Sequence, residues 1–166
     1  MWAYQHHGYA PDVLAFGKKT QVCGICAGPR LDEVESVFSL PSRINSTWGG
    51  NLVDMVRCQR IVEIIEQQNL LENAARVGAQ LVAGLEALAE RFEGRLGNAR
   101  GRGMFVAFDL IDRESRDHVL GRMAEAGVLA LRSGTRSIRF RPALNLTSEE
   151  AEEALWRTSQ ALEAAL

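Results

Sequence analysis

Apolar residues recur at helical spacing through the centre of the chain. They follow one another every three to four positions from about Gly50 to Ile65, and the pattern resumes from Leu70 to Phe92 over about six turns. The polar run Gln67-Gln68-Asn69 separates the two stretches. The spacing therefore predicts two consecutive helices, one starting near Gly50 and one covering about residues 70–92.

Short apolar runs bounded by glycine or proline predict strands elsewhere. The expected strands cover residues 104–110, 128–131 and 137–141, with two more between residues 11 and 27. In the run 137–141, Ile138 and Phe140 alternate with Arg139 and Arg141, which is typical of a strand with one buried face. The glycine- and arginine-rich stretch 94–103 is expected to be a connection without regular structure.

Three further helices are predicted on either side of these strands. A short one is expected over residues 31–37, and a second runs from Arg113 until Gly127 closes it. The last begins with a capping box formed by Thr147 and Glu150. Its buried face is expected to carry Ala151, Leu155, Thr158 and Leu162. Strands and helices that alternate in this way indicate an α/β or α+β fold.

Composition and charge limit the classes of binding partner that the sequence supports. A chain of 166 residues suits one domain or two small ones, and its net charge of -2 gives no electrostatic reason to expect nucleic acid or an anionic membrane as partner. No apolar run approaches the roughly 20 residues that cross a bilayer. The first residues lack the basic and apolar regions of a signal peptide, so a cytoplasmic location is expected.

The cysteines and histidines offer little chemistry. Cys23 and Cys26 form a C-x-x-C pattern, and a thiol redox or metal module remains a distant alternative, but a zinc site needs two more ligands at suitable spacing. We expect both, like Cys58, to be small buried apolar residues. No metal site is expected, and the three histidines are assigned to the surface or to packing.

Lys18 is the residue whose position suggests catalysis. The apolar run 13–16 predicts a strand, Gly17 ends it, and the lysine follows directly. An amine held at a strand end, partly out of water, has a lowered pKa and can attack a carbonyl carbon, as in a Schiff base with pyridoxal phosphate. The alternative is a solvated loop lysine. The position at a strand end does not by itself distinguish Lys18 from Lys19.

Two further residues fit the binding of anions. Thr47 precedes two glycines and a helix start, where free backbone amides favour phosphate, although Thr47 or Ser46 would equally serve as the cap of that helix. Arg139 presents a fork-shaped guanidinium that suits a carboxylate, although an arginine on an edge strand is often simply solvated.

Three segments in the same order resemble one family. They are Phe-Gly-Lys-Lys-Thr-Gln-Val-Cys-Gly at 16–24, Asn-Ser-Thr-Trp-Gly-Gly-Asn-Leu at 45–52 and Ile-Arg-Phe-Arg-Pro-Ala-Leu-Asn at 138–145. The chain resembles the class III pyridoxal-phosphate aminotransferases over nearly its whole length, and most closely the members that act on L-lysine. The resemblance implies an α/β fold of the aspartate-aminotransferase type. Residues 1–69 would be the tail of the large cofactor domain with the connecting helix, and residues 70–166 the small C-terminal domain.

The resemblance also assigns roles and partners. Lys18 would bind pyridoxal 5'-phosphate covalently and move the substrate proton, Thr47 would contact the phosphate of a partner subunit's cofactor in a homodimer, and Arg139 would hold the α-carboxylate of 2-oxoglutarate or glutamate. The implied reaction moves the ε-amino group of L-lysine to 2-oxoglutarate. Ornithine or 4-aminobutyrate would be the amino donor in the nearest alternative.

Other parts of the family's site have no counterpart here. The acidic residue at the pyridinium nitrogen, the glycine-rich phosphate turn, the stacking aromatic ring and a second carboxylate-binding arginine precede the first matched segment in the family. We therefore expect the chain to be a C-terminal portion whose isolated activity is impaired. A catalytically silent interaction module is the alternative from another class, and an exposed apolar patch around residues 10–27 would favour it.

Overall fold

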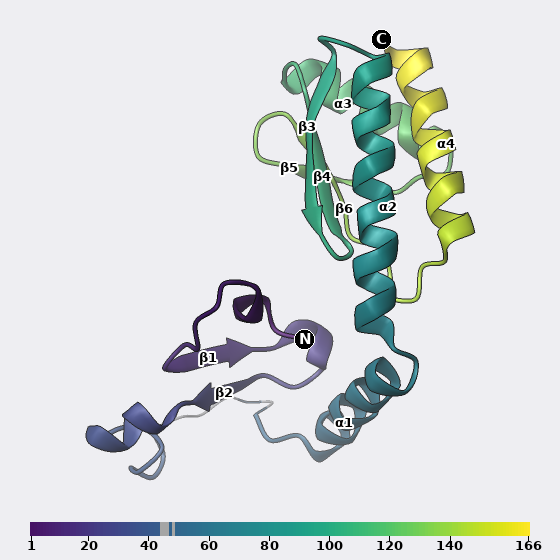
Figure 1. Cartoon of the computed structure of the whole chain (residues 1–166). Coiled ribbons are helices and arrows are strands. Elements are labelled where there is room, and N and C mark those ends of the chain that lie inside the picture. The colour runs from purple at the N-terminus through teal and green to yellow at the C-terminus, as the bar shows by residue number, and fades with distance from the viewer. Residues whose placement is uncertain (44–46, 48) are drawn as a thin grey trace. The chain divides into compact units, whose positions relative to one another are not determined.

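The computed structural model describes residues 1–43, 47 and 49–166 (Figure 1). These residues form two compact units, Met1–Gln68 and Asn69–Leu166. The division falls one residue before the domain boundary placed at residues 69 and 70 from the sequence. In the described residues, no helix combines the length and the apolar character that crossing a membrane requires.

The N-terminal unit contains a hairpin and a helix. Its elements are η1 (Ala3–His6), β1 (Val13–Phe16), η2 (Lys18–Thr20), β2 (Gly24–Ala27), η3 (Pro29–Glu33) and α1 (Leu52–Gln67). β1 pairs with β2 in antiparallel fashion, and η2 contacts α1. The hairpin and the first long helix are confirmed. None of the described residues of this unit is fully buried.

The short helix predicted over residues 31–37 is wrong. A 3₁₀ turn, η3, occupies Pro29–Glu33 instead, and its proline lies at the first turn, where the missing N–H is not needed. Val34 donates its backbone N–H to the Leu31 carbonyl and then adopts an extended conformation, with φ of -135° and ψ of 153°. The chain therefore leaves the helical region before a second turn forms.

The C-terminal unit is a four-stranded antiparallel sheet packed with three helices. Its elements are α2 (Leu70–Arg91), β3 (Leu96–Arg102), β4 (Phe105–Leu110), α3 (Arg113–Glu125), β5 (Leu131–Ser133), β6 (Ser137–Phe140) and α4 (Ser148–Ala165). The strand order is β3-β4-β6-β5. α2 and α3 contact the sheet, and α4 packs against both helices (Figure 1).

Most predicted elements of this unit are confirmed, including the capping box of α4. The Thr147 backbone N–H donates to the Glu150 carboxylate at 2.9 Å, and the Glu150 N–H donates back to the Thr147 hydroxyl at 3.2 Å. Gly127 ends α3 with a φ of 83°, which glycine adopts without strain. Ala151, Thr158 and Leu162 are buried on one face of α4, and Leu155 is partly buried there.

Two predictions about strands are wrong. The stretch 94–103 is not an irregular connection, because β3 occupies Leu96–Arg102. A register shift between Gly97 and Arg100, with Asn98 at a φ of 52°, breaks the alternation that would have revealed this strand. β5 lies at Leu131–Ser133 rather than at 128–131, because Val128 still donates its N–H to the Met123 carbonyl and so completes the end of α3.

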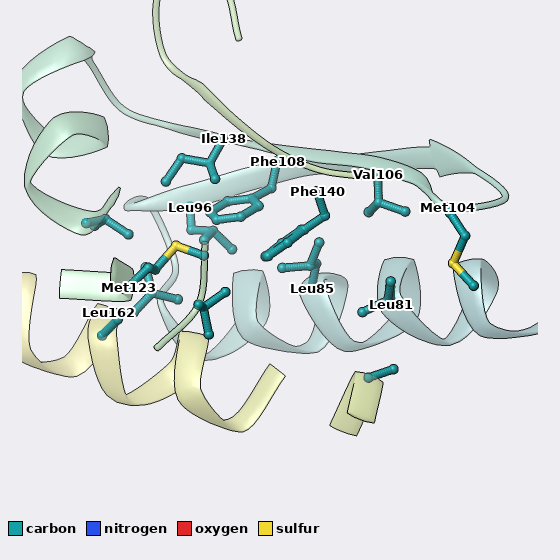
Figure 2. Packing of buried hydrophobic residues seen from close by; sticks show 14 of the residues in the cluster. Leu81, Leu85, Leu96, Met104, Val106, Phe108, Met123, Ile138, Phe140 and Leu162 are labelled. Carbon is teal, nitrogen blue, oxygen red and sulfur yellow. The ribbon is translucent and has the colours of Figure 1, made fainter. Parts of the chain in front are cut away.

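The core lies between one face of the sheet and the helices (Figure 2). Phe108 of β4 and Ile138 of β6 are fully buried there against Leu85 of α2. A Cβ on Gly78 of α2 would lie 2.1 Å from the Gly103 carbonyl oxygen, so only glycine allows this close approach of the helix to the β3–β4 turn. Residues that alternate with the core positions lie on the opposite face of the sheet.

Candidate functional site

Lys18 begins the tight turn η2, one residue after the end of β1. Its φ is 59°, in the left-handed region that costs a residue with a side chain about 1–2 kcal/mol. The Lys18 carbonyl accepts the backbone N–H of Gln21 at 3.0 Å, and Gln21 is itself left-handed with a φ of 66°. Strained backbone of this kind is concentrated at functional sites. Lys19, by contrast, has no positive φ.

Close packing of the strand ends fixes the start of this turn. Phe16 pairs with Gly24 in the hairpin, and a Cβ on Gly24 would lie 2.3 Å from an atom of the Phe16 ring. The Phe16 ring therefore lies against the backbone of Gly24, which has no side chain. The centre of the Trp2 ring lies 5.9 Å from the centre of the Phe16 ring. These contacts set the direction in which the chain reaches Lys18.

The expectation that Lys18 is partly withdrawn from water is wrong for this chain. Lys18 and Lys19 are both exposed, because a two-stranded hairpin leaves its tip open to solvent. They are the two lysines of the sequence, whose remaining cationic side chains are arginines and histidines. Any chemistry that needs an ε-amine therefore has two candidate residues.

Thr47 lies in an exposed turn and does not cap α1. The cap is Asn51, whose side-chain oxygen accepts the Val53 backbone N–H at 3.0 Å. Ser46, the other capping candidate, lies outside the described residues. The first turn of α1 also carries Asp54, which pairs with Arg57 at 3.2 Å. Asn51 therefore caps the N-terminus of α1, and the Thr47 hydroxyl does not serve as its cap.

Arg139 lies on the face of the sheet opposite the core. Its neighbours across the ladder are Ala107 of β4 and Leu131 of β5. The guanidinium carbon lies 5.8 Å from the centre of the Phe105 ring, within the range of a cation–π contact. Its Nε is buried and has no hydrogen-bond partner in the described part of the chain. The ion pairs and hydrogen bonds of the described residues include none to this guanidinium.

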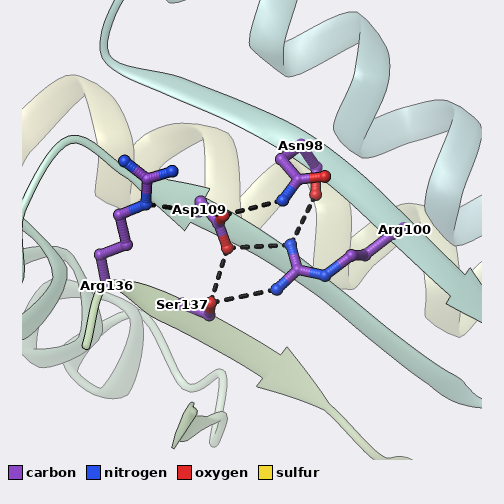
Figure 3. A network of polar contacts seen from close by, with 5 residues as sticks. All are labelled: Asn98, Arg100, Asp109, Arg136 and Ser137. Atoms are coloured by element: carbon purple, nitrogen blue, oxygen red, sulfur yellow. Dashed lines mark hydrogen bonds and ion pairs between the residues drawn. The ribbon is translucent and has the colours of Figure 1, made fainter. Parts of the chain in front are cut away.

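A polar network surrounds Asp109 on the same face (Figure 3). One carboxylate oxygen accepts the Ser137 hydroxyl at 2.6 Å and an Arg100 Nη at 2.8 Å, and the other accepts the Asn98 amide at 2.8 Å. Burial raises the pKa of Asp109, but these hydrogen bonds and the charge of Arg100 outweigh that effect and lower the pKa to about 2. Asp109 is therefore a carboxylate at neutral pH.

The expected burial of the cysteines is wrong for two of them. Cys23 and Cys26 are exposed, and Cys58 is partly exposed. The described residues contain no group of three or more potential metal ligands, and His6, His7 and His118 lie at the surface.

The three predicted site residues belong to different units. Lys18 and Thr47 lie in the N-terminal unit and Arg139 in the C-terminal one. Sequence reasoning missed Phe105 and Asp109. The signal for Asp109 was a carboxylate inside an otherwise apolar strand, which requires partners when it is buried.

Comparison with known proteins places this chain in a family. The family model for class III aminotransferases matches residues 1–162. The chain belongs to the class III aminotransferases. It is 56% identical over 156 residues to the L-lysine-epsilon aminotransferase of Amycolatopsis lactamdurans, covering 93% of this chain and 35% of that protein. The mitochondrial 4-aminobutyrate aminotransferase of Sus scrofa is 34% identical over 145 residues, covering 86% of this chain and 28% of that protein.

A solved structure confirms the predicted α/β fold of this class III aminotransferase chain. The lysine aminotransferase of M. tuberculosis is 46% identical and superimposes with a TM-score of 0.94, over 99% of this chain and 38% of that one. The chain thus spans little more than a third of the length of the relatives that it matches.

Proposed function

We propose that this chain contributes to a transaminase that moves the ε-amino group of L-lysine to 2-oxoglutarate with the help of pyridoxal 5'-phosphate. The identity of 56% to an L-lysine-epsilon aminotransferase, against 34% to a 4-aminobutyrate aminotransferase, carries this choice of donor. The division into units supports a second proposal, that residues 1–69 end the large cofactor domain and residues 70–166 form the small C-terminal domain.

The donor groups on the chain fit the cofactor. An aldehyde needs an accessible amine, and Lys18 offers one from a strained turn that follows a strand end. A phosphate needs hydroxyl or amide donors, and Thr47 is an exposed hydroxyl whose helix is capped by another residue. When bound, the cofactor supplies an electron sink for the substrate carbon that loses its proton.

Lys18 has two tasks in this proposal. Its Nζ would hold the cofactor, and the free amine would take the proton from the substrate carbon that carries the amino group. The strained φ of Lys18 favours it over Lys19 for both tasks, because that conformation sets the direction of the side chain at the strand end.

Thr47 and Arg139 bind the anionic groups. Thr47 donates its hydroxyl to the phosphate of the cofactor held by a second copy, which makes a homodimer the active form. Arg139 holds the α-carboxylate of 2-oxoglutarate or glutamate. Its guanidinium is the one on that face with an aromatic contact and no ion pair among the described residues, so its positive charge is available to a carboxylate.

The test uses the fact that the sequence has two lysines. The 166-residue chain is incubated with pyridoxal phosphate, reduced with borohydride and mapped by peptide mass spectrometry. We expect the label on Lys18, its loss in Lys18→Arg, and its retention in the matched control Lys19→Arg. Arginine keeps the positive charge but does not condense with the aldehyde. Equal labelling of Lys18, Lys19 and the N-terminal amine would contradict the assignment of Lys18.

A silent interaction module is the second candidate function. The observation that favours it is the exposure of apolar side chains on the hairpin, where Val13 is 48% and Ile25 is 41% exposed. In that case the chain binds another protein surface through this hairpin, and equal labelling of the amines is the expected result of the same experiment.

A further inference from the structure

The sheet face that carries Arg139 holds a row of side chains in register. Ala107 of β4 pairs with Arg100 of β3 on one side and with Arg139 of β6 on the other. Arg139 pairs in turn with Leu131 of β5. Residues paired in this way point to the same face of a sheet. Two arginines therefore flank one alanine, and the structure must keep their charges apart or give each a partner.

Arg100 has partners of its own. It donates to the Asp109 carboxylate at 2.8 Å and to the Ser137 hydroxyl at 3.1 Å, and one of its Nη atoms also donates to the Asn98 carbonyl at 2.8 Å (Figure 3). A guanidinium that is held by three acceptors and paired with a carboxylate is poorly available to an added anion. Within the described residues, the network thus leaves Arg139 as the guanidinium of this row that has no ion pair.

Arg139 is held in a different way. Ala107 and Leu131 beside it offer no side-chain acceptor, and its buried Nε has no hydrogen-bond partner in residues 1–43, 47 and 49–166. The contact that orients its guanidinium is the Phe105 ring, at 5.8 Å. Phe105 lies two residues before Ala107 on the same face, and the residue remains 52% exposed. An aromatic face attracts a cation without using any of its N–H donors.

We propose that Phe105 is a positioning residue for Arg139 in carboxylate binding. The ring holds the plane of the guanidinium while the two terminal nitrogens stay free to donate to one carboxylate group. The ligand class is a short dicarboxylate, such as 2-oxoglutarate or glutamate. This inference rests on the proposed function, because it takes Arg139 as the carboxylate-binding residue.

The experiment measures binding of glutarate, a dicarboxylate without reactive groups, to the 166-residue chain. Proton–nitrogen NMR spectra follow the Nε–H signals of the arginines during the titration, with Arg139→Lys used to assign its signal. We expect replacement of Phe105 by leucine to move the Arg139 signal of the free chain, since the ring current is lost. We also expect roughly a two- to fivefold rise in the glutarate dissociation constant.

Two controls separate positioning from a general loss of structure. Phe105→Tyr keeps an aromatic face and is expected to restore the affinity of the parent chain. Trp156→Leu removes another exposed aromatic side chain, on α4, and is expected to leave the affinity unchanged. Circular dichroism confirms that each variant retains its fold.

Two outcomes would overturn the inference, and they differ. Equal affinities of the parent chain and Phe105→Leu would leave Arg139 as the carboxylate ligand but remove the role of Phe105. A glutarate response at Arg139 no larger than that at the exposed Arg141 would remove both this inference and the proposed role of Arg139, while the assignment of Lys18 would still depend on its own labelling experiment.

Discussion

The two units of this chain differ in how they are held together. Every buried side chain of the described residues lies between Ala74 and Leu162, within the C-terminal unit. The N-terminal unit has a paired hairpin and a capped helix, but none of its described side chains is buried. Local hydrogen bonds and turn geometry therefore shape the surroundings of Lys18, whereas a packed core supports Arg139.

This difference separates two kinds of site residue. The direction of Arg139 follows from the strand register, because Ile138 and Phe140 on either side of it must face the core. For Lys18 the chain provides the turn but leaves the amine exposed. The environment that a catalytic amine needs is therefore not produced by the packing of this chain alone.

The largest expected loss of stability comes from a substitution in the core of the C-terminal unit. Phe108→Ala removes a fully buried ring from β4, and we expect a loss of about 3–5 kcal/mol in the free energy of unfolding. The matched change in the other unit, Val56→Ala on α1, removes a side chain that is 67% exposed and is expected to change stability by less than about 0.5 kcal/mol. Urea unfolding followed by circular dichroism measures both. Similar losses would show that the N-terminal unit has a core after all.

The next effect concerns pH. The pKa of Asp109, about 2 in the fold, lies below its ordinary value of 3.8, so its contribution to stability is present above about pH 4 and is lost as the pH falls towards 2. The shift corresponds to roughly 2 kcal/mol. Unfolding measured between pH 2 and pH 7 should show this loss in the parent chain.

Substitution isolates the Asp109 contribution. In Asp109→Asn the corresponding part of the acid dependence should disappear, with a loss of about 1–3 kcal/mol at neutral pH because Arg100 loses its charged partner. Glu86→Gln on α2 is the control, since it removes the same charge from an exposed side chain that makes no ion pair or hydrogen bond with the described residues. An unchanged acid dependence in Asp109→Asn would mean that other carboxylates dominate.

The smallest effect compares two helix caps. Thr147→Ala removes the hydroxyl that accepts the Glu150 N–H in the α4 capping box and should lower the stability of the C-terminal unit by about 1 kcal/mol. Asn51→Ala removes the cap of α1 and should leave the thermal transition of the cored unit unchanged. Calorimetry of the two variants checks this, and a shared drop in transition temperature would show that the two units unfold together.

Regular patterns made some elements predictable from the sequence. The helices α1 and α2, the capping box at Thr147 and the glycine end at Gly127 depend on neighbours within a few residues, so their signals are local. β3 was missed because its bulge at Gly97 and Arg100 hides the two-residue period. The alternative that Thr47 caps α1 is wrong, because the cap is Asn51, a residue well suited to capping and nearer to the helix.

The sequence by itself determined the family, the long helices and the residues Lys18, Thr47 and Arg139 as candidates, because short motifs and local periodicity carry that information. Only the tertiary structure decided that Phe105 faces Arg139, that Asp109 holds Arg100, and that Lys18 remains exposed. These facts depend on strand register and on burial between residues far apart in the chain, and neither is set by local sequence.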